Sequence, residues 1–347
     1  MSVKAKLVGA AGYGGIGLVE LLTFHPEAEI VSLTDKVDFG KPLSAFYPHL
    51  RGICDLEVQE AGKETESAKP DVVFFATPNG VGMHLAKSYL DRGVKVIDYS
   101  GDFRFLEVGL FEEYYGLCHA SPELAKQAVY GLPELYREQL RSATLVGNPG
   151  CLATSAILAV TPALKAGLID HRTLIIDAKT GVSGAGKNPN PSFHFPHRNE
   201  NMNAYRVVSH QHVPEIEDQL SRVAGEPVQV GFTPHVVPQT RGILATAYAT
   251  LRDPVSADTA RAAYQEHYAG EPFVRVMPTG DCPGTIAVRG SNLCDLTVNV
   301  DERNGRLIVC ACLDNLMKGQ SGSALQNMNL ICGLDETLGL ARAPFYP

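Results

Sequence analysis

A glycine-rich turn near the start of the chain constrains the fold more than any other feature of the sequence. The turn, Gly9-Ala-Ala-Gly-Tyr-Gly-Gly15, joins a predicted strand at Val3–Val8 to a predicted helix at Ile16–Phe24. Glycines at such a point let the backbone turn tightly and approach a pyrophosphate, whose charge is met by N–H groups of the helix N-terminus. The spacing differs from Gly-x-Gly-x-x-Gly, but the flanking strand and helix favour a nucleotide site over a purely structural turn.

The residues after this turn repeat the alternation of strand and helix. A helix is expected at Val81–Leu90, and strands are expected at Glu29–Leu33, Val72–Ala76, Val94–Ile97 and Thr144–Val146. Near-continuous apolar strands that are linked by helices predict a parallel sheet with both faces covered. The first part of the chain is therefore predicted to be a doubly wound, dinucleotide-binding α/β domain.

The pattern changes after the turn Asn148-Pro-Gly150. A helix is expected at Cys151–Ala166, and longer strands of alternating hydrophobicity follow it. These strands are expected at Leu174–Ala178, Val228–His235, Ile243–Leu251, Phe273–Met277, Leu293–Asp301 and Leu307–Leu313, with a closing helix at Gly319–Leu330. The alternation predicts a second, α+β domain with a mostly antiparallel sheet.

Length and charge limit the classes of protein and partner. A chain of 347 residues is long enough for two domains with cores of their own. With 30 Lys and Arg against 38 Asp and Glu, the net charge of −8 argues against nucleic acid or an anionic membrane as a partner. The N-terminal apolar run is too short for a signal peptide, and no run approaches the ~20 apolar residues of a membrane span. We expect a soluble, cytoplasmic protein.

Eight cysteines are spread along the chain, which is typical of free thiols in a reducing compartment. Cys151 differs because it follows Asn148-Pro-Gly150 at the start of a predicted helix, where the dipole and N–H groups stabilise a thiolate and can hold an oxyanion. This position favours a catalytic nucleophile over a buried small residue. The other seven are expected to serve packing, including Cys310 and Cys312, which lack partners at metal-ligand spacing.

A nucleophilic cysteine needs a partner that handles protons, and two histidines are candidates. His210 and His212 precede a predicted helix that is rich in early acidic residues, so they are expected on an ordered turn at its start. An imidazole there can assist thiolate formation and later protonate an oxyanion. Spacing alone does not separate this role from that of a solvent-facing pair. His194 and His197 are expected to be loop residues, and we expect no metal site.

The end of the second strand, Thr34-Asp-Lys36, carries conflicting signals about the cofactor. An acidic residue such as Asp35 can bond the ribose 2′-hydroxyl of NAD, whereas hydroxyls and a cation accommodate the 2′-phosphate of NADP. These residues alone leave the choice open.

Cations suited to an anionic substrate recur in Gly-rich segments of both halves of the chain. They are Arg104, Lys187, Arg206 and Arg241. The planar guanidinium of arginine matches carboxylate and phosphate groups. Each cation alone is more typical of a surface side chain, but their recurrence favours an anionic small molecule as the substrate.

Several of these segments together resemble a known family. The resemblance runs in order from residue 7 to about residue 335, and the matching segments are Gly9–Gly15, Ser100-Gly-Asp-Phe-Arg104, Tyr130-Gly-Leu-Pro-Glu134, Asn148-Pro-Gly-Cys151, Thr180–Gly186, His210-Gln-His-Val-Pro-Glu-Ile-Glu217, Phe232-Thr-Pro-His235, Arg241-Gly-Ile-Leu-Ala245 and Asp314-Asn-Leu-Met-Lys-Gly319. They resemble the N-acetyl-γ-glutamyl-phosphate reductases of arginine biosynthesis. Aspartate-semialdehyde dehydrogenases share the architecture, but their motifs fit less well.

The resemblance implies an NADP-dependent acyl-phosphate reductase that forms an aldehyde and releases phosphate. Cys151 would attack the carbonyl carbon and expel phosphate, leaving a thioester that hydride from NADPH reduces to the semialdehyde. His210 aligns with the family's acid/base histidine, and His212 is the second choice.

The resemblance also implies binding residues, domain limits and assembly. The substrate residues are Arg104, Asn148, Ser183, Arg206 and Arg241. The NADP residues are Gly9, Ala11, Gly12, Tyr13, Gly14, Thr34 near the 2′-phosphate, Pro78, Gly184 and Asn315. Asn315 and Lys318 lie beside the cofactor in the family, so the closing helix is expected to return to the first domain. We predict a dinucleotide-binding domain of residues 1–147 plus 319–347 and a catalytic and dimerisation domain of residues 148–318, in a homodimer or homotetramer.

Three departures from the family pattern leave the catalytic groups intact. Ala11 stands where Ser is usual, Leu152-Ala153 replaces a frequent Tyr-Pro, and Asp35 puts a negative charge near the expected 2′-phosphate. One alternative is a lysine-pathway aminoadipyl-phosphate reductase, whose substrate differs by one methylene. Another is a non-catalytic nucleotide-binding or redox-sensing protein.

Overall fold

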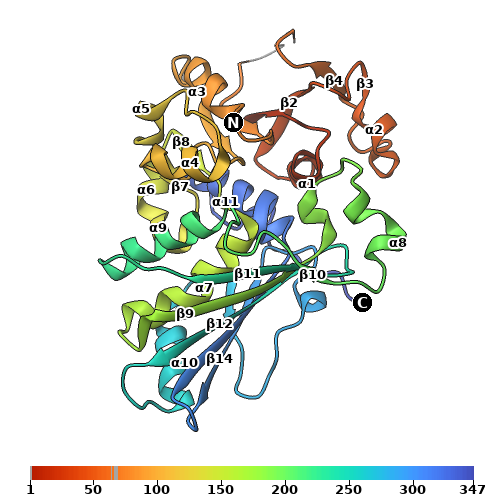
Figure 1. Cartoon of the computed structure of the whole chain (residues 1–347). Coiled ribbons are helices and arrows are strands. Elements are labelled where there is room, and N and C mark those ends of the chain that lie inside the picture. The colour runs from red at the N-terminus through yellow and green to blue at the C-terminus, as the bar shows by residue number, and fades with distance from the viewer. Residues whose placement is uncertain (1, 64, 66–68) are drawn as a thin grey trace. The chain divides into compact units, whose positions relative to one another are not determined.

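The protein divides into two compact units in a computed structural model that describes residues 2–63, 65 and 69–347 (Figure 1). Unit 1 comprises Met1–Pro149 and Gln320–Arg342, and unit 2 comprises Gly150–Gly319 and Ala343–Pro347. The last five residues correct the predicted domain limits, because they pack on unit 2 rather than on unit 1. Phe345 donates its N–H to the carbonyl of Arg289 at 2.8 Å, and its ring lies against Gly290.

Unit 1 is built on a sheet whose strand order is β3-β4-β2-β1-β5-β6-β8-β7. The strands are β1 Val3–Val8, β2 Ala28–Asp35, β3 Lys41–Pro42, β4 Glu57–Glu60, β5 Val72–Phe75, β6 Lys95–Asp98, β7 Val129–Tyr130 and β8 Leu145–Gly147. Every pairing is parallel except that of β3 with β4. The predicted doubly wound α/β architecture is confirmed, and β1 has the predicted bounds.

Helices cover this sheet and bury its apolar strands. They are α1 Tyr13–Leu22, α2 Leu43–Phe46, α3 Gly82–Leu90, α4 Val108–Tyr115, α5 Pro122–Ala125, α6 Pro133–Ser142 and α11 Gly322–Ile331, with a 3-10 turn at Pro48–Leu50. All residues of α11 are buried, and the helix packs against α1 and α6. The closing helix therefore belongs to unit 1, and it begins later than predicted because a π-helical turn occupies Met317–Ser321.

Unit 2 is built on a second sheet with the strand order β10-β11-β9-β12-β15-β14-β13. The strands are β9 Ile169–Thr180, β10 Asn203–Ala204, β11 Gly231–Val236, β12 Ile243–Leu251, β13 Val274–Val276, β14 Cys294–Asp301 and β15 Arg306–Leu313. The pairings of β9 with β11 and of β13 with β14 are parallel, and the others are antiparallel. The predicted mostly antiparallel sheet is confirmed.

The helices of unit 2 are α7 Cys151–Lys165, α8 Phe195–Arg198, α9 Val213–Ala224 and α10 Ala257–His267, with 3-10 turns at Val182–Ala185, Pro191–Phe193 and Thr285–Ala287. Of these, α7 and α10 cover one face of the sheet. Helix α7 packs on β12 and β15, α10 packs on β14, and α9 lies beside α7 (Figure 1). Residues of β12 are alternately buried and half-buried, because only one of the two faces is covered.

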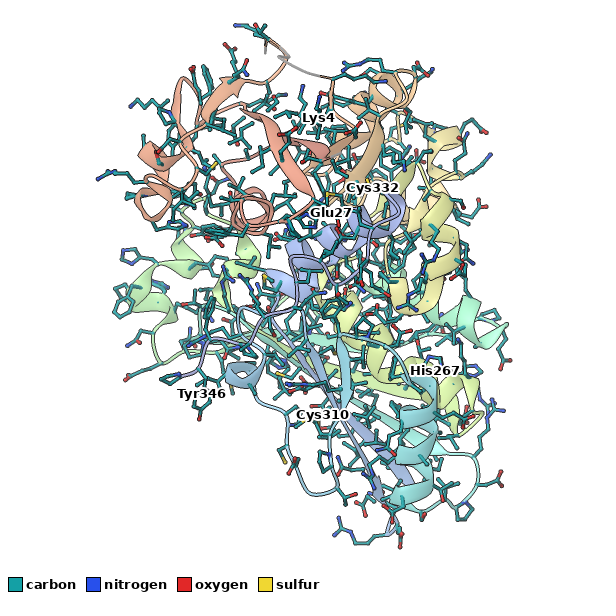
Figure 2. The ribbon with its side chains drawn as sticks, turned by 180° about the vertical axis from the view of Figure 1, so that it is seen from behind. Lys4, Glu27, His267, Cys310, Cys332 and Tyr346 are labelled. Carbon is teal, nitrogen blue, oxygen red and sulfur yellow. The ribbon has the colours of Figure 1, made fainter. Side chains whose placement is uncertain are left out.

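The cysteines differ in exposure, which partly corrects the expectation that all but Cys151 serve packing. Cys310 is half-buried within the sheet of unit 2 (Figure 2), and burial raises the pKa of Cys312 to about 12. Cys118 and Cys282 are exposed, because both lie in irregular segments outside the cores. No disulfide joins cysteines of the described chain. Within the same residues, none of the helices has the length and apolar character needed to cross a bilayer.

Candidate active site

Cys151 is the first residue of α7, as the sequence predicts. Gly150 caps the helix with extended backbone angles, and neither a side-chain cap nor an acidic residue occupies the first turn. The N–H groups of this turn therefore face outward at the end of the helix where the thiol stands. This arrangement stabilises negative charge on the sulfur or on an oxygen bound beside it.

His212 and Glu215 bracket Gly150, the residue before the cysteine. A Cβ atom placed on Gly150 would lie only 2.3 Å from Nε2 of His212, so the imidazole packs directly against this glycine. Gly150 donates its N–H to the Glu215 carboxylate at 2.7 Å, and Glu215 is fully buried. Both side chains come from the start of α9, which lies beside α7. The start of α9 thus holds an imidazole and a carboxylate beside Cys151.

His210 lies deeper than His212 and is neutral. Burial, together with the neighbouring His212 and Arg206, lowers the pKa of His210 to about 2. Its Nδ1 accepts the backbone N–H of His212 at 3.1 Å, which places the ring proton on Nε2. Its ring packs edge-on against His212 and Tyr205 and tilted against Phe232. His210 therefore orders the turn that carries His212.

The backbone of the π-helical turn Met317–Ser321 also lies against Cys151. A Cβ atom on Gly319 would lie 2.7 Å from Cβ of Cys151, so a larger residue would displace the cysteine. The Gly319 N–H is held by the carbonyl of Asp314 at 3.0 Å. Such single-turn π segments are frequent at functional sites. The neighbouring Lys318 is fully buried, with its ammonium 5.7 Å from the ring centre of Phe273.

The segment before His210 brings a phenol and a cation to the same place. Burial raises the pKa of Tyr205, and the electrostatic influence of neighbouring Cys151 contributes to the same shift. Arg206 is exposed and donates to the Gln211 side chain at 3.1 Å. Arg206 and Val208 both have left-handed backbone angles, with φ of 43° and 65°. For a β-branched residue such as Val208 this conformation is strained, as is common next to functional sites.

Other predicted residues of unit 2 form a connected cluster. Asn315 donates to Oγ of Ser183 at 2.9 Å and accepts the N–H of Gly242 at 2.8 Å. Arg241 lies 3.6 Å from the fully buried carboxylate of Asp314. Because Asp314 also holds Gly319, this cluster continues to the segment that touches the cysteine. Gly184 lies on the adjoining 3-10 turn Val182–Ala185.

In unit 1, backbone atoms shape the glycine-rich turn. Gly9 has a φ of 84°, and a Cβ atom on it would lie 2.4 Å from the carbonyl oxygen of Ala76. A Cβ atom on Gly15 would lie 2.3 Å from the carbonyl oxygen of Gly9. Gly12 caps α1 with extended angles and without a side-chain cap. No side chain therefore caps the N–H groups at the start of α1, which fits a pyrophosphate. Tyr13, Gly14 and Ala11 lie on the same turn, and Gly14 accepts the hydroxyl proton of Ser321 at 2.9 Å.

The residues at the end of β2 are placed differently from the expectation for Thr34. Thr34 is fully buried, and its hydroxyl donates to the carbonyl of Leu7 at 3.3 Å inside the sheet. Asp35 instead reaches the turn, where its Oδ2 accepts the N–H of Ala11 at 3.2 Å. Lys36 is exposed.

Arg104 and Asn148 hold the segment that leads to the cysteine. Arg104 is buried and donates to the carbonyls of Asn148 at 2.8 Å and Tyr99 at 2.6 Å. The Asn148 amide donates to the carbonyl of Gln320 at 3.1 Å. Pro78 is exposed in the loop after β5. Lys187 is half-buried and His194 and His197 are exposed. Among the described residues no group of His, Cys, Asp and Glu side chains could hold a metal ion.

Sequence reasoning does not single out Glu215, Tyr205 or Gly319 as site residues. Glu215 and Gly319 lie within segments that carry the family resemblance, and Tyr205 is adjacent in the chain to the candidate cation Arg206. The signal for Glu215 is an acidic residue in the first turn of a helix that begins at a histidine. The signal for Gly319 is a glycine inside a segment that otherwise continues into a helix.

Comparison with known proteins identifies both units. The family model described as "Semialdehyde dehydrogenase, NAD binding domain" matches residues 4–143, and "Semialdehyde dehydrogenase, dimerisation domain" matches residues 151–315. Proteins named N-acetyl-gamma-glutamyl-phosphate reductase are 50% identical in Symbiobacterium thermophilum and 48% identical in Pelotomaculum thermopropionicum, each over 100% of both chains. One of that name in Moorella thermoacetica is 48% identical over 97% of this chain and 98% of its own.

Solved structures share the fold at low sequence identity. Aspartate semialdehyde dehydrogenase II from Vibrio cholerae, complexed with ASA, has a TM-score of 0.73 at 16% identity and covers 96% of this chain and 99% of its own. Aspartate semialdehyde dehydrogenase from Candida albicans, with NADP, has a TM-score of 0.72 at 17% identity and the same coverage.

Proposed function

The chain belongs to the N-acetyl-gamma-glutamyl-phosphate reductase family, and from that premise we propose that it reduces N-acetyl-γ-glutamyl phosphate to N-acetylglutamate semialdehyde with NADPH, releasing phosphate. The observation that carries the proposal is the position of Cys151 at the start of α7, with the His212 imidazole packed against the preceding Gly150. The glutamyl name of the relatives favours this substrate over an aminoadipyl phosphate.

Cys151 is the nucleophile of the proposed reaction. Its thiolate attacks the acyl carbon, the bond between that carbon and the phosphate oxygen breaks, and phosphate leaves with the electron pair, so that a thioester remains on Sγ. NADPH supplies the hydride that reduces this carbon. The N–H groups at the start of α7 stabilise negative charge on the acyl oxygen, and release of the aldehyde returns the thiolate.

In this mechanism His212 accepts the proton of the Cys151 thiol, which forms the thiolate, and donates that proton to the phosphate oxygen as its bond to the acyl carbon breaks. Its Nε2 lies against Gly150, next to the reacting sulfur, whereas Nδ1 of His210 is occupied by the backbone N–H of His212. Burial lowers the pKa of His210 to about 2, so this residue is a neutral imidazole at neutral pH and does not act as the acid. We therefore assign His212 as the acid/base group and His210 as a residue that positions it.

The most direct test is the reverse reaction with purified protein. N-acetylglutamate semialdehyde, phosphate and NADP should give phosphate-dependent NADPH, measured by its absorbance. Cys151→Ser should abolish this signal, because the weaker nucleophile cannot form the thioester. Cys118→Ser is the matched control, since that thiol is exposed in unit 1, and it should keep full activity. Activity that survives Cys151→Ser would contradict the thioester route.

The open face of the unit 2 sheet is proposed to bind a second copy of the chain. Ile175, Tyr248 and Ile308 are paired side by side across three strands of this face, and Ile175 is 48% exposed. The description of the matching family model as a dimerisation domain supports this contact. Ile175→Asp should give monomers in light scattering after gel filtration, and Ile53→Asp, at a similarly exposed residue of unit 1, should not.

Eight cysteines without a disulfide in the described chain support a reducing, cytoplasmic location.

A further inference from the structure

We propose that Asp35 adapts the adenosine end of the dinucleotide site to NAD(H), so that this chain accepts NAD(H) alongside NADP(H). The proposal rests on the dinucleotide-dependent function given above. It concerns one side chain at the end of β2 and its neighbours, all within unit 1.

Asp35 occupies the position at which dinucleotide-binding domains contact the adenosine ribose. It is the last residue of β2, which pairs in parallel with β1, and it follows Gly15 by about twenty residues. The register places Thr34 opposite Val8, so Asp35 lies one residue further along, beside the turn that follows β1. The bond from the Ala11 N–H to its Oδ2 fixes the carboxylate at the turn.

Hydrogen bonding leaves this carboxylate able to accept one more donor. Oδ2 accepts the N–H of Ala11 at 3.2 Å, and Oδ1 accepts those of Val37 at 3.0 Å and Asp38 at 3.4 Å. A carboxylate has about four acceptor positions, so three backbone donors leave one for a ligand. A ribose 2′-hydroxyl can donate to it, whereas a 2′-phosphate at the same place brings negative charge against negative charge.

The hydroxyl of Thr34, which was expected near the 2′-phosphate, points into the sheet. Thr34 is fully buried and donates to the carbonyl of Leu7 within the sheet, so it offers no donor at the surface of the site. The residue that remains at the strand end is acidic, and it has the chemistry of an NAD-binding strand end.

Two nearby lysines explain why NADP(H) is still accepted. Lys36 follows Asp35 directly, Lys41 begins β3, and both are exposed. Flexible ammonium groups at this edge can approach a 2′-phosphate from the solvent side and offset the repulsion from Asp35. The carboxylates at this strand end are Asp35, Asp38 in the following loop, and Glu60, which pairs with Asp35 from β4. Set against Lys36 and Lys41, they predict similar affinities for the two dinucleotides rather than a strong preference.

The test is direct binding, which does not depend on turnover. Calorimetric titration of the full-length chain with NAD⁺ and with NADP⁺ should give dissociation constants within about tenfold of each other. Asp35→Asn keeps an oxygen that can accept the Ala11 N–H and removes the charge. This variant should bind NADP⁺ about tenfold more tightly and NAD⁺ slightly more weakly. Asp35→Ser should shift the ratio in the same direction.

Asp38→Asn is the matched control, because it removes a negative charge from the same loop and leaves the Asp35 carboxylate in place. It should change the ratio of the two dissociation constants by less than about threefold. A wild-type chain that binds NAD⁺ more than about a hundredfold more weakly than NADP⁺, with a ratio unaffected by Asp35→Asn, would overturn the proposal. Failure to bind either dinucleotide would instead overturn the proposed function.

Discussion

Helices α1 and α7 begin in the same way, although they serve different chemistry in different units. Each has a glycine as its N-cap, Gly12 or Gly150, with extended backbone angles, no side-chain cap and no acidic residue in the first turn. Helix α10 shows the ordinary alternative, in which the Ser256 side chain accepts the N–H of Thr259 at 3.1 Å. At α1 and α7 the N–H groups are left for a ligand or a reacting group.

The two helix starts differ in what completes them. Around α1 the closest contacts are between backbone atoms, such as the approach of Gly15 to the carbonyl of Gly9 and of Gly9 to the carbonyl of Ala76. Around α7 they are made by side chains from the start of α9 and by the backbone of Gly319. The glycine-rich turn is thus shaped mainly by backbone atoms, whereas the thiol is surrounded by an imidazole and a carboxylate that the tertiary fold brings to it.

Glycine-to-alanine substitutions at the two helix starts should have different effects. At the start of α7 the added methyl group should lower turnover, and at the start of α1 it should prevent dinucleotide binding. In Gly150→Ala the new Cβ would lie 2.3 Å from Nε2 of His212 and displace the imidazole from the cysteine. We expect kcat to fall at least about 10³-fold, with the dissociation constant of NADP⁺ unchanged. In Gly15→Ala the Cβ would meet backbone oxygens of Gly9 and Ala10 at 2.3 and 2.6 Å, which should abolish dinucleotide binding.

Gly167→Ala helps to interpret these results. Gly167 has a left-handed φ of 65° with open space around it, so its alanine variant tests backbone strain alone. If Gly150→Ala weakened NADP⁺ binding as much as it lowered kcat, the separation of the two helix starts would be wrong.

Substitutions of His210 and His212 should have the next largest effects on kcat. They test the contribution of side chains around the start of α7. His212→Gln removes the imidazole that packs on Gly150, and kcat should fall about 10³-fold. His210→Gln keeps a hydrogen-bonding side chain that can hold the His212 N–H, so kcat should fall only about tenfold. Steady-state kinetics with both variants would decide, and a greater loss in His210→Gln would reverse the assignment.

The ease of prediction from sequence follows the same division. β1, the glycine-rich turn and the start of α7 at Cys151 were predictable because each depends on residues adjacent in the chain. The choice between His210 and His212 was not, because both fit the same turn and only burial and the contact with Gly150 separate them. The placement of Thr34 was likewise hidden, since alternation in a strand that is buried on both faces does not show which side chain reaches the surface.

Substitution of Glu215 should have a smaller effect on kcat. It tests whether the charge of this residue matters or only its hydrogen bond to the start of α7. Glu215→Gln keeps an oxygen that can accept the Gly150 N–H and removes a negative charge beside His212. We expect kcat to fall about tenfold and its basic limb to move to lower pH, because the protonated imidazole loses a favourable neighbour. Glu217→Gln, which changes a carboxylate bonded to the Val230 N–H on the same helix, should leave the pH profile unchanged. If the pH profile of kcat were unaltered in Glu215→Gln, the role of Glu215 would be only to hold the Gly150 N–H.

The smallest effect contrasts the two units through the pH dependence of their stability. In unit 1, burial and the nearby Asp102 raise the pKa of Asp98 from 3.8 to about 8. Between these values the folded chain binds a proton that the unfolded chain has lost, so this group makes stability fall as pH rises from about 4 to 8. In unit 2, burial lowers the pKa of His210 from 6.5 to about 2. There the unfolded chain binds the extra proton, so stability falls as pH drops below 6.5.

Asn substitutions should reveal these opposite slopes. Relative to wild type, Asp98→Asn should gain stability as pH rises from 5 to 8, by at most about 1.4 kcal/mol per pH unit. His210→Asn should instead gain relative stability as pH falls from 7 to 5, with the same limit per unit. Denaturant unfolding at several pH values, with amide exchange of β6 and β11 as local reports on each unit, would measure both slopes. Parallel rather than opposite slopes would mean that burial does not set the charge of these two groups, and the neutral state assigned to His210 would have to be abandoned.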